Sequence, residues 1–162
     1  KLLNLPIITN QSSLYDEGHL RFTTIEKISL LDNAQLYSSE QPGLAILDSE
    51  EDAAALGGLV SDAARDWLEA LDYDRQFALV VFAGLKPAME YGVTVDTLLR
   101  KDNAVYIEAM LVEPDPGVPI TQVISSPYHA IEISKVGDWG QEIIFYLVID
   151  GEIVASQDRL IR

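Results

Sequence analysis

The chain has 162 residues, a length that suits one domain, and 48% of them are hydrophobic, which is enough for a packed core. Its formal net charge of −15 excludes the basic stripe that nucleic acids and anionic membranes require. The absence of cysteine excludes disulfides, zinc–thiolate sites, iron–sulfur clusters and thiol nucleophiles. No apolar run approaches the roughly 18 residues that a membrane-spanning helix needs.

The first part of the chain combines a terminal arm with short strands. Residues 1–18 join an apolar start to the polar patch Thr9–Ser13, which indicates an N-terminal arm followed by a loop. β-Branched and aromatic residues nearly alternate from Leu20 to Ile28, and Gly43–Leu47 is a short apolar run. Both patterns predict strands.

A helical segment is predicted at about residues 49–72. Ser49 and Asp52 have the spacing of a capping box, with acidic residues in the first turn. Gly57-Gly58 is expected to divide the segment into two helices. Apolar residues at helical spacing predict one buried stripe, and we interpret Trp67 within it as a core anchor. The stripe consists of Val60, Ala64, Trp67, Leu68 and Leu71.

After Leu71 the hydrophobic pattern changes to a period of two residues, which is typical of strands. Phe77–Ala83 is apolar on both faces and therefore predicts a central strand that is covered on both sides. Asp150-Gly151 favours a tight hairpin between the last two predicted strands. Further strands are predicted at Tyr91–Leu99, Ala104–Glu113, Ile120–Ile124 (at an edge), His129–Ile133, Glu142–Ile149 and Glu152–Ser156, with a hairpin-like connection at Val136–Gly140.

Consecutive strands with short connections favour antiparallel pairing. We therefore predict an α+β protein, mainly an antiparallel β-sandwich or partly closed barrel, with the helical segment packed on one sheet face. Residues 1–162 are expected to form a single domain.

The chain lacks an identifiable catalytic or metal-binding constellation, so we predict no enzyme, cofactor or metal site. Its two histidines, His19 and His129, lie far apart, and His129 on an apolar strand face is interpreted as a hydrogen-bonded structural residue. The acidic run Asp48–Asp52 is explained more simply by helix capping than by calcium binding. Ser125 and Ser126 are too close in sequence to His129 to form a catalytic pair along a strand.

Six elements follow one another between residues 77 and 135. They are Val80–Gly84, Lys86-Pro87, Tyr91, Val93–Val95, Glu113–Gly117 and Ser126–His129. Their order and spacing resemble the C-terminal domain family of the protease complex subunit PrcB. The family's Thr-Gly-Gly before the tyrosine is replaced here by Ala88-Met89-Glu90, so any tight turn that those glycines permit is expected to be lost or remodelled.

The resemblance implies a non-catalytic, exported bacterial domain that holds a protein partner such as an exported protease or a cell-envelope protein. It implies a periplasmic, cell-surface or extracellular location, with a lipid anchor on a removed N-terminus as one form. The residues indicate three loops for recognition, at 84–91, 113–119 and 125–129, because loops on a rigid β scaffold commonly carry binding. The candidate partner-binding residues are Lys86, Pro87, Met89, Tyr91, Pro114, Pro116, Pro127 and Tyr128.

Three alternatives stay open at this point. The prolines in the loops would equally protect sheet edges and terminate strands. The many acidic residues are compatible with a domain that binds or processes carbohydrates or other small ligands. The edge strands are compatible with a structural module that forms homo-oligomers.

Overall fold

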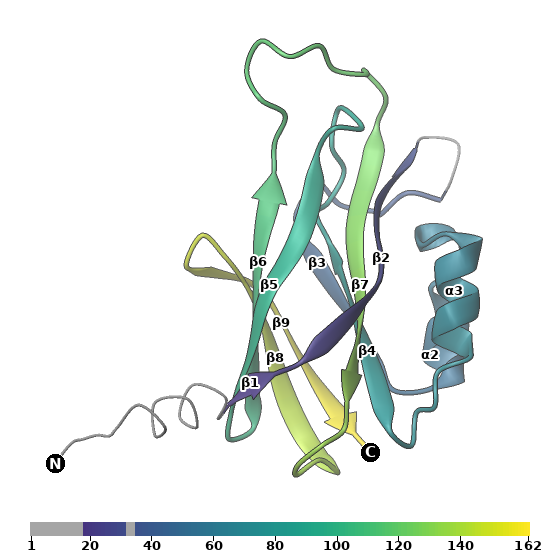
Figure 1. Ribbon diagram of the computed structural model, residues 1–162, viewed down its shortest axis with the longest axis vertical. Coiled ribbons are helices and arrows are strands. Elements are labelled where there is room, and N and C mark those ends of the chain that lie inside the picture. Colours follow the sequence, from purple (N-terminus) through teal and green to yellow (C-terminus); the bar gives the residue numbers. More distant parts are fainter. Residues whose placement is uncertain (1–17, 32–34) are drawn as a thin grey trace, which may run out of the picture.

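The computed structural model describes residues 18–31 and 35–162, so the predicted arm lies outside the described residues except for Gly18. In the described part, nine strands form two sheets that pack face to face, and short helices cover the outer face of one sheet (Figure 1). The predicted α+β sandwich is therefore confirmed. The strands are β1 (His19–Leu20), β2 (Phe22–Leu31), β3 (Gly43–Leu47), β4 (Gln76–Phe82), β5 (Gly92–Lys101), β6 (Ala104–Val112), β7 (Ser125–Ser134), β8 (Gln141–Ile149) and β9 (Glu152–Ile161).

The two sheets differ from the predicted pattern in one pairing. Sheet A has the order β1-β5-β6-β8-β9 and sheet B has the order β2-β7-β4-β3. All neighbours are antiparallel except β6 and β8, which run parallel with Ala104 opposite Ile144. The chain leaves sheet A after β6, passes down sheet B as β7, and returns to sheet A as β8. The Val136–Gly140 segment therefore connects two sheets and is not the hairpin that we predicted.

β4 explains why a strand can be apolar on both faces. Phe77, Leu79 and Val81 point into the core between the two sheets. Ala78 and Phe82, from the alternate positions, pack in a second core under the helices. All of these side chains are buried, as the pattern of Phe77–Ala83 predicts.

The helical segment is divided into α2 (Glu50–Ala55), the 3-10 helix η1 (Gly57–Leu59) and α3 (Asp62–Glu69). The Asp52 N–H donates to Ser49 Oγ at 3.1 Å, which confirms the predicted cap, and Ser61 caps α3 in the same way. Gly57 has a φ of +55° between the helices, so the predicted interruption is also confirmed.

Trp67 was predicted to be a core anchor, and this prediction is wrong: half of its surface, 50%, is exposed. The buried side chains of α3 are Ala64 and Leu68. At about 100° per residue, Trp67 lies some 60° to one side of Ala64, away from Leu68. In a helix of two turns that offset places the indole at the margin of the contact with sheet B.

Two further strand predictions have opposite outcomes. The β8–β9 hairpin forms around Asp150 and Gly151, whose φ values of +54° and +78° suit a primed turn. The predicted strand at Ile120–Ile124 does not form, because the Val123 N–H bonds back to the Thr121 carbonyl at 2.9 Å and turns the chain. Residues 113–124 are instead a long loop between β6 and β7.

Candidate protein-binding site

Two of the three predicted recognition loops lie together at one end of the sandwich. Residues 84–91 connect β4 to β5, and residues 113–124 form the long arch between β6 and β7 at the top of Figure 1. Lys86 and Ser125 form an isolated β-bridge in which each backbone N–H donates to the other residue's carbonyl at 2.9 Å. This bridge joins the base of one loop to the base of the other.

Further hydrogen bonds continue this contact outward along the loops. The Met89 N–H donates to the Thr121 carbonyl at 3.3 Å, and the Thr121 N–H donates to Glu90 Oε1 at 2.9 Å. The buried Ser125 hydroxyl donates to the Ala88 carbonyl at 2.7 Å. The Thr121 N–H lowers the pKa of the Glu90 carboxyl below its ordinary value, so this acceptor is charged at neutral pH. The loops are therefore held as one unit.

These contacts also show how the chain accommodates the change from the family's Thr-Gly-Gly. In the described residues the only non-glycine positions with positive φ are Asp102 and Asp150, so Ala88-Met89-Glu90 needs no glycine-only backbone. Ala88 is buried, Glu90 binds the neighbouring loop, and Met89 projects outward. The turn is remodelled into a contact between loops, as expected from the departure.

The surface of this unit is apolar. Met89 is 42% exposed although its N–H binds the neighbouring loop, and Val118 is 53% exposed although its N–H donates to the Asp115 carbonyl at 3.2 Å. Pro87 and Pro116 are exposed beside them, whereas Lys86, Tyr91 and Pro114 are partly covered. We call the exposed side chains the loop surface; they are Pro87, Met89, Pro116, Val118, Ile120 and Ile124.

A groove of about 300 Å³ lies next to the loop surface, between β2 and the start of β5. Ile28, Tyr91 and Val112 contribute apolar walls, and Lys27 contributes a charge. The Ser29 hydroxyl donates to the Tyr91 carbonyl at 2.9 Å and holds the two sides together. The groove extends the apolar area at this end of the molecule.

The prediction of a third recognition loop at residues 125–129 is wrong, because these residues form the first part of strand β7 and are buried. Pro127 lies opposite Ser29 of β2, and its carbonyl accepts from the Ala83 N–H at 2.9 Å. Proline has no backbone N–H to donate within a sheet, but its carbonyl can still accept a hydrogen bond, so Pro127 is compatible with strand β7. Pro127 and Tyr128 are therefore unavailable to a partner.

Tyr128 joins three elements inside the protein. Its hydroxyl donates to Glu26 of β2 at 2.5 Å and accepts from the Ser61 N–H, at the start of α3, at 3.0 Å. Burial, followed by the hydrogen bond to Glu26, raises the pKa of Tyr128 to about 12. The residue thus positions the helices on sheet B.

His129 is a buried structural residue, as predicted. The Val95 N–H donates to its Nδ1 at 2.9 Å, and Nε2 lies 2.8 Å from the Thr24 hydroxyl. Nδ1 is therefore the acceptor, and Nε2 carries the proton. Burial, with a smaller contribution from the Lys27 charge, lowers the pKa of His129 to about 4.

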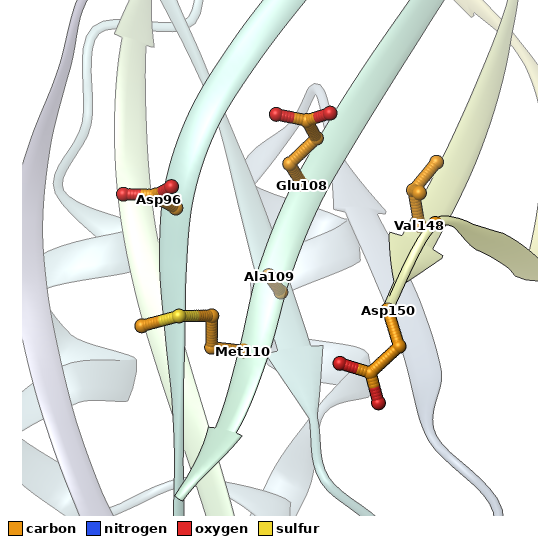
Figure 2. Close-up of a pocket in the computed structure, with 7 residues that line it drawn as sticks. Asp96, Glu108, Ala109, Met110, Val148 and Asp150 are labelled. Carbon is orange, nitrogen blue, oxygen red and sulfur yellow. The ribbon is translucent and has the colours of Figure 1, made fainter.

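A second depression, of about 190 Å³, lies on the outer face of sheet A (Figure 2). Asp96, Glu108 and Asp150 surround it, but their carboxylates point in different directions and do not converge on one position. Among residues 18–31 and 35–162, no cluster of histidine and acidic side chains could hold a metal ion. The depression therefore gives no support to paired-carboxylate catalysis.

Val118, Ile120 and Ile124 were not among the predicted contact residues, although Val118 lies within the predicted recognition loop 113–119. Their signal was present, since these apolar residues stand in a proline-rich loop without strand or helix periodicity. We assigned two of them to an edge strand instead. Single exposed apolar side chains are common, but several of them in one loop that forms no regular element indicate a binding surface.

A family model described as PrcB C-terminal matches residues 77–134. The predicted resemblance to the PrcB C-terminal family is confirmed for this segment. The match begins within β4 and ends with β7, so it includes β5, β6 and both linked loops. The helices, the first three strands, β8 and β9 lie outside the match.

No curated protein and no solved structure matches the chain. No helix of the described residues is long and apolar enough to cross a bilayer.

Proposed function

We propose that this protein is a non-catalytic accessory domain that binds a protein partner in a bacterial protease complex through the loop surface. The match to the PrcB C-terminal family supports an accessory role in a protease complex. The observation that carries the assignment to this surface is the pair of linked loops, whose backbones bind each other while their apolar side chains face solvent.

The fixed backbones matter for binding strength. Ordering a flexible loop on association costs free energy, and a loop that is already ordered avoids most of that cost. The Lys86–Ser125 bridge and the Thr121 bonds supply this order before a partner arrives. Met89, Val118 and Ile120 are then available as contact residues in a preformed surface.

The chemistry of the loop surface favours a protein over a small ligand. Its side chains are exposed on two neighbouring loops, whereas small-molecule sites usually bury most of the ligand. Its exposed side chains are apolar, while Glu90, Glu113 and Asp115 in the same two loops are acidic. We infer a partner face with an apolar centre and basic or polar surroundings.

A co-purification experiment tests the proposal. The chain is co-expressed with exported proteases encoded by the same genome, and recovery of each protease is compared between wild type and the triple variant M89A/V118A/I120A. The variant is expected to lose at least tenfold in affinity for the protease that binds, because central apolar contacts dominate most interfaces. The matched control is V136A, which truncates a valine with 77% exposure in the connection at the other end of the sandwich.

V136A is expected to recover the protease as wild type does. Equal recovery by the triple variant, with intact amide spectra, would remove the loop surface from the interface. Failure of every protease to co-purify with wild type would instead contradict the accessory role.

We also propose that the domain acts outside the cytoplasm, in the periplasm, at the cell surface or in the medium. The family resemblance is the support for this location. The reading frame upstream of Lys1 provides the test, since an export signal or a lipobox cysteine is expected there. A cytoplasmic protein fused directly to Lys1 would contradict the proposal.

A further inference from the structure

The two tryptophans of this protein have opposite surroundings. The Trp139 ring meets Phe77 edge-on at 5.0 Å, and its Nε1 donates to the Val136 carbonyl at 3.1 Å. The Arg100 guanidinium lies over the ring of Trp139, 4.2 Å from its centroid. For Trp67, no described residue bonds the indole N–H or stacks on the ring, and half of the side chain is exposed.

Trp67 lines an open groove of about 700 Å³ beside α3. Three carboxylates share this groove, and none of the described residues that line it is a lysine or an arginine. Its remaining lining includes small and aliphatic side chains. We call it the Trp67 groove; its lining consists of Ala63, Asp66, Trp67, Ala70, Leu71, Asp72, Gln76 and Glu132.

The carboxylates of the groove are only partly engaged within the protein. The Gln76 amide donates to Glu132 at 3.2 Å, and no lysine or arginine among the described residues forms an ion pair with this carboxylate. Asp72 lies 3.7 Å from Arg75, but that arginine side chain is 86% exposed and makes a weak surface pair. Within the described ranges, Asp66 has no ion-pair partner.

We propose that the Trp67 groove binds an arginine side chain presented by an extended segment of a protein partner. A guanidinium can stack on an exposed indole while it forms paired hydrogen bonds to a carboxylate, which an ammonium group cannot match. The protein already stacks a guanidinium on an indole, where Arg100 covers Trp139 while its Nε donates to the Asp102 backbone carbonyl at 3.0 Å. The three carboxylates supply the complementary charge.

Charge also disfavours a second copy of this chain as the occupant. Each copy carries a formal net charge of −15, so two copies repel each other over long range. A basic segment of another protein is attracted by the same field. The occupant that complements both the groove and the whole chain is therefore a cationic segment of a different protein.

The Trp67 groove lies away from the loop surface. The groove includes Gln76 at the start of β4, while the 84–91 loop follows the other end of the same strand. Seven residues of strand separate the two by about 20 Å. The Trp67 groove would thus be a second contact, on another side of the molecule.

The test is a nuclear magnetic resonance titration that follows the two indole N–H signals. The probes are acetyl-Gly-Arg-Arg-Gly-amide and the same peptide with citrulline, a neutral isostere, in place of arginine. We expect the arginine peptide to shift the Trp67 signal saturably and to leave the Trp139 signal in place. The citrulline peptide is expected to bind at least tenfold more weakly, and added salt to weaken the arginine peptide.

Two charge-matched variants locate the effect. D66N and D158N remove one negative charge each, but Asp158 lies on β9 of the other sheet. D66N is expected to weaken the arginine peptide at least threefold, whereas D158N leaves it unchanged. M89A/V118A/I120A is expected to bind the peptide as wild type does, which separates this inference from the proposed function.

Equal affinity for the two peptides would overturn the proposal, because stacking alone would then explain binding. The absence of a saturable Trp67 shift at millimolar arginine peptide would overturn it as well. An equal loss in D66N and D158N would show general charge attraction and no specific groove.

Discussion

The two ends of the sandwich are stabilised in different ways. At the loop end, backbone groups bind each other and apolar side chains face solvent. At the opposite end, charged side chains are buried and paired. Asp48 and Lys135 form an ion pair with 2.6 Å between Oδ1 and Nζ, and their side chains are 2% and 5% exposed.

The buried pair has partners on several elements. Lys135 Nζ also donates to the carbonyls of Tyr73 and Arg162, each at 2.5 Å. Asp48 Oδ2 accepts from the Arg162 N–H at 2.8 Å. These bonds join the ends of β3, β7 and β9 to the connection before β4.

A second pair extends this network to the helices. Asp52 in α2 binds the Arg159 guanidinium and accepts from the Asp48 N–H at 2.8 Å. Tyr73 lies nearby, and burial, with the surrounding carboxylates, raises the pKa of its hydroxyl well above the ordinary value. That hydroxyl stays protonated and donates to the Leu68 carbonyl at 2.6 Å.

The two ends therefore have different expected roles, one in stability and the other in binding. Side chains at the charged end form ion pairs and hydrogen bonds within the protein, so their loss should weaken the fold. Side chains of the loop surface make few internal contacts, so their loss should weaken association and leave the fold intact. Substitutions at the two ends test whether stability and binding are divided in this way.

The largest expected effect is that of K135M at the charged end. Removing one partner of a buried ion pair leaves an uncompensated charge, which typically costs about 3–5 kcal/mol of unfolding free energy. Urea denaturation at pH 7 measures the loss. The double variant D48N/K135M removes both charges and is expected to lose less than K135M alone. A loss under about 1 kcal/mol in K135M would show that this end is not the more stabilising one.

The next effect concerns a glycine that holds the loop end in place. A Cβ at Gly84 would lie 2.3 Å from the Glu40 carbonyl oxygen, and its φ is +88°. We expect G84A to cost about 2–4 kcal/mol, from backbone strain together with the clash. Gly117 is the matched control, because its φ is +83° but nothing lies within 4 Å of an added Cβ.

G117A should therefore cost only the strain, about 1–2 kcal/mol. Urea denaturation of both variants gives the comparison. Equal losses would mean that the contact between Gly84 and the 35–42 segment does not restrain the loop. The comparison isolates the effect of the steric clash, since both glycines have nearly the same positive φ.

Local patterns predicted much of this fold. The unbroken apolar run Phe77–Ala83, the Ser49 cap and the Asp150-Gly151 turn each depend on neighbouring residues, and all three are present in the structure. Pairing between distant segments was not predictable in this way. The parallel β6–β8 pair results from the passage of β7 through the other sheet.

The candidate site shows the same limit. Met89 and Pro87 were identified because they are unusual residues in a loop, whereas Tyr128 was misassigned because proline at 127 usually ends a ladder. The Glu90–Thr121 bond joins residues that are distant in the sequence, so no local sequence pattern predicts it. Trp67 was misassigned because a periodic stripe does not specify which side chain lies at its margin.

A third effect depends on pH and lies between the two ends, at His129. In the unfolded chain a histidine binds a proton below about pH 6.5, whereas folded His129 does so only near pH 4. The unfolded state therefore holds more protons in this window. Stability that is present above pH 6.5 is lost as the pH falls toward 4, by on the order of 2–3 kcal/mol.

The His129 contribution is isolated with H129Q, which can still accept from Val95 and does not titrate. Urea denaturation of both proteins at pH 7.0 and 4.5 is expected to show a smaller decrease in the variant. The carboxylates contribute equally to both proteins, so the difference reports on His129. Parallel decreases would mean that the imidazole is not buried in its neutral form.

The smallest expected effect on stability is that of V118A on the loop surface. Its side chain is more than half exposed in a loop, so truncation should change the unfolding free energy by less than about 0.5 kcal/mol. V105A truncates the same side chain in the core between the sheets and should cost about 2 kcal/mol. If V118A were as destabilising as V105A, Val118 would be part of the fold. A small loss in stability together with weakened partner recovery would instead show that the loop end is ordered by its backbone for binding.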